Sequence, residues 1–222
     1  MRAPGPAWVL GLEQTAGRGR RARAWASPRG NFHGSLVMQP AGDAGQVALR
    51  SFVASLALRD ALAAVTGLPQ AFTLKWPNDV LCNGGKIAGI LLESVSSGAG
   101  VAHLVVGIGV NLIAAPDQTM IEAGAVPPVT LLGETGKRVE PEAFLNALAP
   151  AFALREGQLL AKGFASIRLD WLSHAANLGQ PIRARTGTAT HLGTYETIDQ
   201  DGALILKTGQ GRLAIPAADV FF

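Results

Sequence analysis

The chain has 222 residues, of which 48% are hydrophobic and 16% charged, and its formal net charge is +3. This length suffices for one large domain, alone or with a small appendage, and the hydrophobic fraction excludes intrinsic disorder. A single cysteine, Cys82, excludes a disulfide-stapled scaffold, and four scattered histidines give no zinc spacing, so no metal site is predicted. With no signal peptide and no apolar run of about 20 residues, the sequence predicts a cytoplasmic protein without a membrane segment.

Hydrophobic patterning divides the first third of the chain into two strands, a loop and a helix. Residues 7–13 and 32–39 are apolar strand segments, and residues 15–31 between them follow neither the strand nor the helix period. Asp43, with a glutamine three residues later, forms a capping-box-like pair. This pair predicts a helix that ends before Gly67.

Further strands and a long helical stretch are predicted next. Asn83-Gly84, a strong hairpin signal, lies between two strand segments, and a proline-containing loop covers residues 114–129. Pro141 opens a helical stretch that extends to about residue 176, and we expect Gly157 and Gly163 to divide it. The strand segments of this part are residues 72–76, 80–82, 86–93 and 101–112.

The composition changes after Asn177 to short alternating segments with turns at Asp201-Gly202 and residues 209–211. Because residues 177–222 are too few to form a large core, they are predicted to form a small β-barrel docked on the main domain. The expected domains are therefore residues 1–176 and residues 177–222. The four predicted strands of the second domain are residues 181–185, 189–198, 203–207 and 212–215.

The basic residues are concentrated in the first loop. Five arginines lie between residues 18 and 29 with no acidic residue among them, whereas the remaining chain carries 14 basic and 16 acidic residues. Glycines at 17 and 19 allow the loop to fold over a polyanion, and guanidinium groups offer forked donors to phosphate or carboxylate oxygens. A solvated basic loop or a nucleic-acid patch is the alternative. The five are Arg18, Arg20, Arg21, Arg23 and Arg29.

Two later segments also carry candidate functional residues. Lys75-Trp76-Pro77-Asn78-Asp79 delivers a lysine, an amide and a carboxylate to a rigid turn, and Lys86 enters the apolar strand that follows. Asn111 ends the segment Gly107-Ile-Gly-Val-Asn-Leu. Each has an ordinary alternative, because lysines mark sheet edges or extend to water, and Asn and Asp are common turn residues.

Taken in this order, the three segments resemble the biotin protein ligases. The resemblance is carried by Gly-Arg-Gly-Arg-Arg-Xaa-Arg-Xaa-Trp, Lys-Trp-Pro-Asn-Asp and Lys-Xaa-Ala-Gly-Ile-Leu-Xaa-Glu, and it runs from about Trp8 to Leu112. It implies an α+β catalytic domain with a mixed β-sheet and packed helices, plus an SH3-like C-terminal β-barrel. It also implies an enzyme that forms biotinyl-5'-AMP from biotin and ATP, with Mg²⁺ accompanying ATP. The biotin then passes to a lysine of a biotin carboxyl carrier protein.

The resemblance also assigns roles to residues of this sequence. Lys86 and Arg20 would be the catalytic residues, close to the biotin carboxylate and the α-phosphate. The implied biotin-binding residues are Gln14, Gly17, Arg18, Gly19, Arg20, Lys86 and Gly89. The implied ATP-binding residues are Arg23, Trp25, Asn78, Asp79 and Asn111.

Two features expected of the family are absent. No helix-turn-helix segment precedes the first strand, so we expect no specific DNA binding. Family members also carry a Ser-Thr-Asn segment ahead of this strand, whereas only 13 residues precede Gln14 here, so a short form is expected.

Two other functions remain open. A lipoate or octanoate ligase of similar fold would need a long apolar tunnel and a different arginine–lysine pattern. A non-catalytic anion- or nucleic-acid-binding protein would show steep salt dependence without ATP turnover. A homodimer is compatible with each of these functions.

Overall fold

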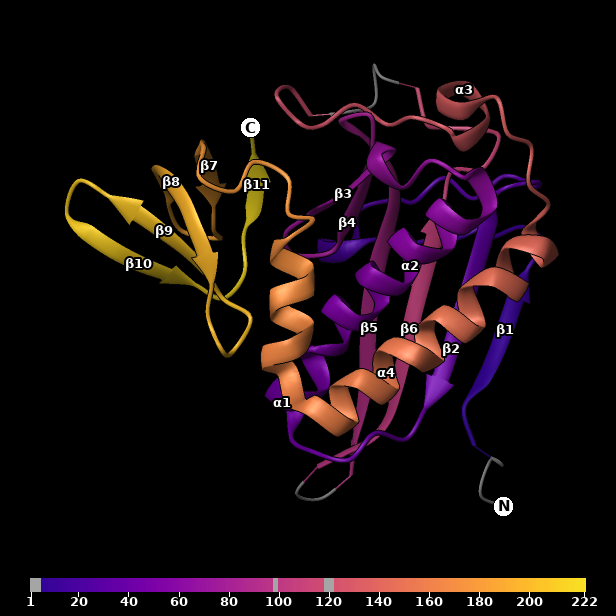
Figure 1. Cartoon of the computed structure of the whole chain (residues 1–222), viewed down its shortest axis with the longest axis horizontal. Coiled ribbons are helices and arrows are strands. Elements are labelled where there is room, and N and C mark those ends of the chain that lie inside the picture. Colours follow the sequence, from indigo (N-terminus) through magenta and orange to yellow (C-terminus); the bar gives the residue numbers. More distant parts are fainter. Residues whose placement is uncertain (1–4, 98–99, 118–121) are drawn as a thin grey trace.

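The computed structural model describes residues 5–97, 100–117 and 122–222. Its larger part is a six-stranded sheet with the order β1-β2-β6-β5-β4-β3, and helices α2 and α4 cover one face of it (Figure 1). All neighbouring strands of this sheet are antiparallel. The strands are β1 (Ala7–Gly11), β2 (Phe32–Met38), β3 (Phe72–Lys75), β4 (Asp79–Cys82), β5 (Gly85–Ser97) and β6 (Gly100–Val110).

Local signals explain where the helices begin and end. The side chain of Asp43 accepts a hydrogen bond from the backbone N–H of Gln46 and completes the predicted capping box. Gly67 ends α2 with a φ of 73°, a left-handed conformation that favours glycine. The helices are α1 (Ala44–Ala48), α2 (Arg50–Thr66), α3 (Leu131–Thr135) and α4 (Pro141–Leu172), and short 3₁₀ turns span Arg20–Ala22 and Pro69–Ala71.

The long helix α4 is interrupted once. Gly163 leaves the helical conformation, with φ 72° and ψ 176°, and divides α4 as predicted. The predicted division at Gly157 is wrong, since this residue lies within the continuous helix. A glycine in a helix interior costs only about 1 kcal/mol relative to alanine, which the packing of α4 against α2 offsets.

The C-terminal part is a separate five-stranded sheet of order β10-β9-β8-β7-β11, to the left of the first sheet in Figure 1. The predicted small β domain is confirmed, but its sheet is open, with β10 and β11 as its two edges. β11 is absent from the prediction because three residues are too few to show alternation. The strands are β7 (Pro181–Arg185), β8 (Thr190–Ile198), β9 (Leu204–Thr208), β10 (Gly211–Ile215) and β11 (Asp219–Phe221).

The α+β class is confirmed. The parallel pairing of the expected mixed sheet is limited, among the described residues, to the isolated bridges Leu74–Ala175 and Lys86–Pro128. Within those same residues, no helix is long and apolar enough to cross a membrane.

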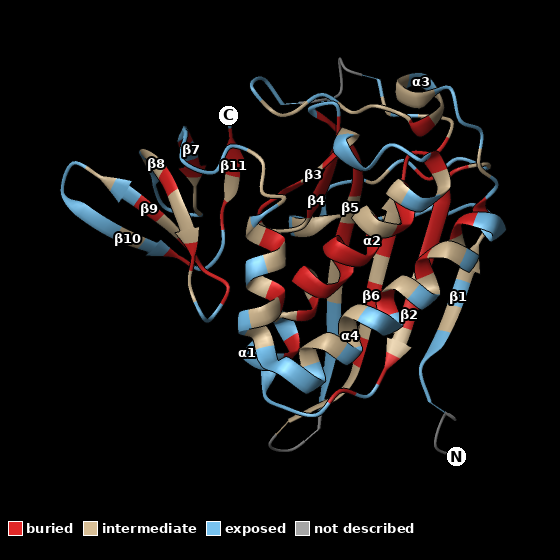
Figure 2. Cartoon of the chain, in the orientation of Figure 1, coloured by how far each residue is buried: buried red, intermediate tan, exposed pale blue. Residues whose placement is uncertain are grey.

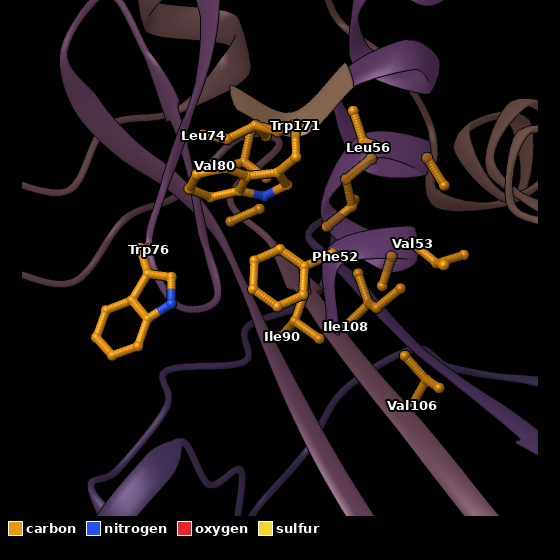
Figure 3. Close-up of a cluster of buried hydrophobic side chains, with 14 of the residues drawn as sticks. Phe52, Val53, Leu56, Leu74, Trp76, Val80, Ile90, Val106, Ile108 and Trp171 are labelled. Atoms are coloured by element: carbon orange, nitrogen blue, oxygen red, sulfur yellow. The ribbon is translucent and has the colours of Figure 1, made fainter. Parts of the chain in front are cut away.

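The core lies between the first sheet and its helices, where buried residues gather on α2 and the central strands (Figure 2). Phe52 lies near the centre of this cluster, and its ring packs edge-on against Trp171 with centroids 5.5 Å apart (Figure 3). The indole N–H of Trp171 donates to Ser55 Oγ at 2.9 Å, and that of Trp76 donates to the Gly202 carbonyl at 3.0 Å. The last bond ties the first sheet to the C-terminal part.

We expect Trp171→Ala to lower the free energy of unfolding by about 3–5 kcal/mol, because it removes a large buried ring and leaves a cavity. Trp171 is 1% exposed, whereas Leu169, two residues earlier in α4, is 66% exposed. Leu169→Ala is therefore the matched control, with an expected change of about 0.5 kcal/mol or less. Urea unfolding of both variants measures the difference, and equal destabilisation by the two would contradict this account of the core.

Candidate active site

Two glycines lie next to each other on the face of the first sheet that the helices do not cover. Gly89 on β5 and Gly109 on β6 are directly opposite each other in the register. Their chain neighbours Ile90 and Ile108 point into the helix-covered core (Figure 3), so the glycines face the other side. We call Gly89 and Gly109 the glycine floor.

Polar residues flank the glycine floor in the same row. Asp79 on β4 is paired with Gly89, and His33 on β2 is paired with Gly109. Directly opposite residues share one face of a sheet, so the two side chains lie at either end of the floor. The His33 Nε2 is 3.1 Å from the Pro28 carbonyl oxygen, and its buried Nδ1 has no hydrogen-bond partner among the described residues.

The loop of residues 14–27, here the arginine loop, folds back over the floor. The Trp25 N–H donates to the Gly17 carbonyl at 2.9 Å, and the Gly19 N–H donates to the Arg23 carbonyl at 2.8 Å. A Cβ on Gly17 would lie 2.5 Å from the Trp25 carbonyl oxygen, so no other residue fits there without a shift. Both predicted loop glycines are thus used in bringing the two halves of the loop together.

The arginine loop is closed at its base and delivers Trp25 to the floor. Ser27 Oγ donates to Gln14 Oε1 at 2.8 Å. A Cβ added to Gly89 would lie 3.2 Å from Trp25 Cζ3, and one added to Gly109 would lie 2.4 Å from Trp25 Nε1. The indole therefore rests directly on both glycines. Trp25, which the resemblance assigned to ATP, thus contacts Gly89, which the resemblance assigned to biotin.

Lys86 is held at the edge of the floor by a buried carboxylate. Its Nζ lies 2.7 Å from Asp79 Oδ1 and 5.5 Å from the centroid of the Trp25 ring. Lys75, which is absent from the predicted site residues, places its Nζ 3.7 Å from Asp79 Oδ2. Three charged groups are thereby joined in one cluster beside the glycine floor.

The cluster perturbs the titration of its members. Burial acts to raise the pKa of Asp79, but Lys86 and Lys75 outweigh it and hold that pKa below its ordinary value. Burial, assisted by the positive charge of Lys86, lowers the pKa of Lys75. Asp79 consequently remains ionised at neutral pH and keeps the Lys86 ammonium oriented towards the site.

Arg20 joins the same cluster from the arginine loop. Its Nη1 lies 3.5 Å from Asn78 Oδ1 and 3.3 Å from the Ala218 carbonyl oxygen, and Asn78 Nδ2 donates to the Ile90 carbonyl at 2.6 Å. Burial lowers the pKa of Arg20, with Asp219 and Asp79 opposing this shift. Asn78 directly precedes Asp79 in the chain, so the structure brings Arg20 and Lys86, the two predicted catalytic residues, to neighbouring residues at the start of β4.

The other predicted residues are less central. Arg18 is exposed and forms an isolated backbone bridge with Ala24. Arg23 turns to Asp219 of β11. Asn111 is buried just beyond β6, where its N–H donates to the Ile87 carbonyl at 2.8 Å and its carbonyl accepts from the Leu131 N–H at 2.8 Å.

The structure brings three further residues to this site: Lys75, which belongs to a candidate segment but received no role from the resemblance, and His33 and Asp219, which no sequence pattern selected. Lys75 lies four residues before Asp79 in the same motif, so this short separation in sequence indicated that the two could pair. His33 lies in an ordinary strand, and Asp219 is far along the chain, so no local signal identifies either. In the described residues, no group of three or more His, Cys, Asp or Glu could hold a metal ion.

Two family models match the chain. The model described as the biotin/lipoate A/B protein ligase family covers residues 2–111, and that of the biotin protein ligase C-terminal domain covers residues 178–222. The fold and site thus define a protein ligase of the biotin and lipoate class.

Individual relatives narrow this class. A biotin–acetyl-CoA-carboxylase ligase of Paracoccus denitrificans is 59% identical over 98% of this chain and 91% of that protein. The bifunctional ligase/repressor BirA of Bacillus subtilis is 33% identical over 98% of this chain and 66% of its own length. The biotin protein ligase from Aquifex aeolicus in complex with biotin and ATP matches with a TM-score of 0.83 and 25% identity, over 99% of this chain and 90% of that one. The chain belongs to the biotin protein ligase family, and the resemblance carried by the three motifs is confirmed.

Proposed function

We propose that this protein is an ATP-dependent biotin–protein ligase. It joins the biotin carboxylate to the α-phosphate of ATP, releases pyrophosphate, and transfers biotin from biotinyl-5'-AMP to a lysine of a biotin carboxyl carrier protein. The observation that carries the proposal is the cationic cluster beside the glycine floor, in which Lys86 pairs with Asp79 and Arg20 contacts the adjacent Asn78. The Paracoccus relative, named for the same activity, supports it.

The first step must bring two anions together. Unit like charges about 4 Å apart repel by about 4 kcal/mol at an effective dielectric of 20, so positive groups are needed where the carboxylate meets the phosphate. Lys86 and Arg20 supply them from fixed positions, and Mg²⁺ arriving with ATP as part of the substrate neutralises further phosphate charge. No side-chain nucleophile is required, because the biotin carboxylate itself attacks the α-phosphorus.

We assign the two substrates to the two sides of Lys86. The biotin side comprises Gln14, Gly17, Arg18, Gly19, Arg20, Lys86 and Gly89, and the ATP side comprises Arg23, Asn78, Asp79 and Asn111, with Trp25 between them. Since the indole of Trp25 rests on the glycine floor, biotin binding displaces it or stacks the substrate ring against it. The catalytic domain then comprises residues 1–176 and the small β domain residues 177–222.

The partners follow from this activity. The protein acts in the cytoplasm on the carrier domain of a biotin-dependent carboxylase, alone or as a homodimer. It binds neither specific DNA nor a membrane.

The decisive experiment mixes the protein with biotin, Mg-ATP and a biotin carrier domain. We expect biotin-dependent pyrophosphate release and labelling of the carrier lysine, and little of either when lipoate or octanoate replaces biotin. Pyrophosphate release that depends on lipoate or octanoate would indicate the related acyl ligase. Salt-sensitive nucleic-acid binding without ATP turnover would indicate a binding protein instead.

A further inference from the structure

Three guanidinium groups converge on one carboxylate of the C-terminal sheet. Asp219 Oδ2, at the start of β11, lies 3.1 Å from Arg21 Nη1, 2.7 Å from Arg23 Nη2 and 3.1 Å from Arg185 Nη2. Arg185 is the register partner of Asp219 on β7, whereas Arg21 and Arg23 come from the arginine loop. The carboxylate side chain is 13% exposed. An anion thus sits where three like charges would otherwise repel one another.

The neighbouring contacts strengthen this junction. The carbonyl of Ala218 accepts from Arg20 Nη1, so three arginines of the loop contact two consecutive residues of the C-terminal part. Glu122 forms a second acidic partner at the rim, where it pairs with Arg185 and lies 3.9 Å from Arg23. The junction therefore links the arginine loop to a sheet that the catalytic residues do not belong to.

The backbone conformation at Arg21 and Ala22 requires stabilising contacts from outside the loop. Arg21 and Ala22 adopt φ values of 56° and 57°, in the left-handed region that residues other than glycine rarely occupy. Two such residues in succession are unfavourable unless the surroundings over-determine their conformation. Few apolar side chains anchor this part of the loop, because Arg20–Ala22 contains no buried residue. The contacts of Arg21 and Arg23 with Asp219 restrain it from outside, in addition to hydrogen bonds within the loop such as that from the Gly19 N–H to the Arg23 carbonyl.

We propose that Asp219 is a positioning residue that holds the arginine loop closed over the glycine floor and thereby strengthens the binding of ATP. The role rests on the ligase function proposed above. Asp219 neutralises one of the three positive charges of Arg21, Arg23 and Arg185. Arg20 and the remaining positive charges stay available to phosphate oxygens. The loop is then already assembled when ATP arrives, so less ordering accompanies binding.

Asp219→Asn tests this role, because it keeps the size of the side chain and removes its charge. Glu196→Gln is the matched control, since Glu196 on β8 pairs with Arg212 on β10 in the same sheet, away from the loop. Asp219→Glu restores the carboxylate. Limited trypsin digestion of the ligand-free proteins, with cleavage at the loop arginines followed by mass spectrometry, reports loop opening without requiring activity. Steady-state pyrophosphate release gives KM for ATP and kcat.

We expect Asp219→Asn to increase loop cleavage and the KM for ATP by about tenfold each, with kcat within about twofold of wild type. Asp219→Glu should recover most of both losses, and Glu196→Gln should match wild type. Loop cleavage and KM equal to those of Glu196→Gln would overturn the role, as would a lower KM, which would make Asp219 a competitor of the phosphates. A wild-type protein without pyrophosphate release refutes the ligase function, while the digestion still tests the hold on the loop.

Discussion

Lys86→Ala abolishes biotinyl-adenylate synthesis while the fold persists: we expect kcat/KM for biotin-dependent pyrophosphate release to fall by about 10³-fold or more. Removing one fixed electrostatic group from a reacting centre costs about 10²–10³ in rate, and here two anionic substrates lose the same ammonium. The unchanged fold follows from the position of Lys86, whose side chain is 29% exposed and lies outside the hydrophobic core. Pyrophosphate assays and circular dichroism measure the two effects.

Two controls separate the charge of Lys86 from its contact with Asp79. Lys137→Ala removes an exposed lysine and should retain full activity. Lys86→Ala combined with Asp79→Asn removes the carboxylate that the single variant leaves without its 2.7 Å partner. The double variant should remain inactive, because the ammonium is still missing. Near-normal pyrophosphate release by Lys86→Ala would refute the catalytic role. Recovery in the double variant would assign the loss to Asp79, which keeps only Lys75 as a partner when Lys86 is removed.

Features encoded by neighbouring residues could be predicted from the sequence. The capping box of Asp43 and the end of α2 at Gly67 each depend on a few consecutive residues. Asn83 and Gly84 adopt φ values of 49° and 86°, as the predicted hairpin turn requires. The motif residues Arg20 and Lys86 were found for a different reason, since their spacing resembles that of a known family rather than any local folding signal.

Features that depend on pairing between distant segments could not be predicted. The row that contains Asp79, Gly89, Gly109 and His33 follows from the register of four strands, and a shift of one residue would turn these side chains to the other face. Gly89 alone was therefore recognised as part of the floor, without Gly109. Asp219 is 196 residues from Arg23 along the chain, and only the docking of the C-terminal sheet brings them together.

Gly109→Ala gives the second large expected effect, a rise in the KM for biotin of about 10- to 100-fold. The new methyl group would lie 2.4 Å from Trp25 Nε1, so the indole must leave the floor, and the methyl then occupies space that we assign to the biotin ring. Overpacking of this kind costs about 1–3 kcal/mol, which corresponds to the stated change in affinity.

Gly107→Ala is the matched control for Gly109→Ala, because it adds a methyl group to the same strand without approaching Trp25. Its Cβ would meet the Leu91 carbonyl oxygen at 3.4 Å, an ordinary contact, and no Trp25 atom is among its nearest neighbours. The difference in fluorescence between each variant and the same variant carrying Trp25→Phe isolates the signal of this indole. Gly109→Ala should shift that signal and Gly107→Ala should preserve it. A Gly109→Ala protein with an unchanged Trp25 signal and an unchanged KM for biotin would show that the glycine floor does not receive the substrate, because a methyl group placed there would then obstruct nothing.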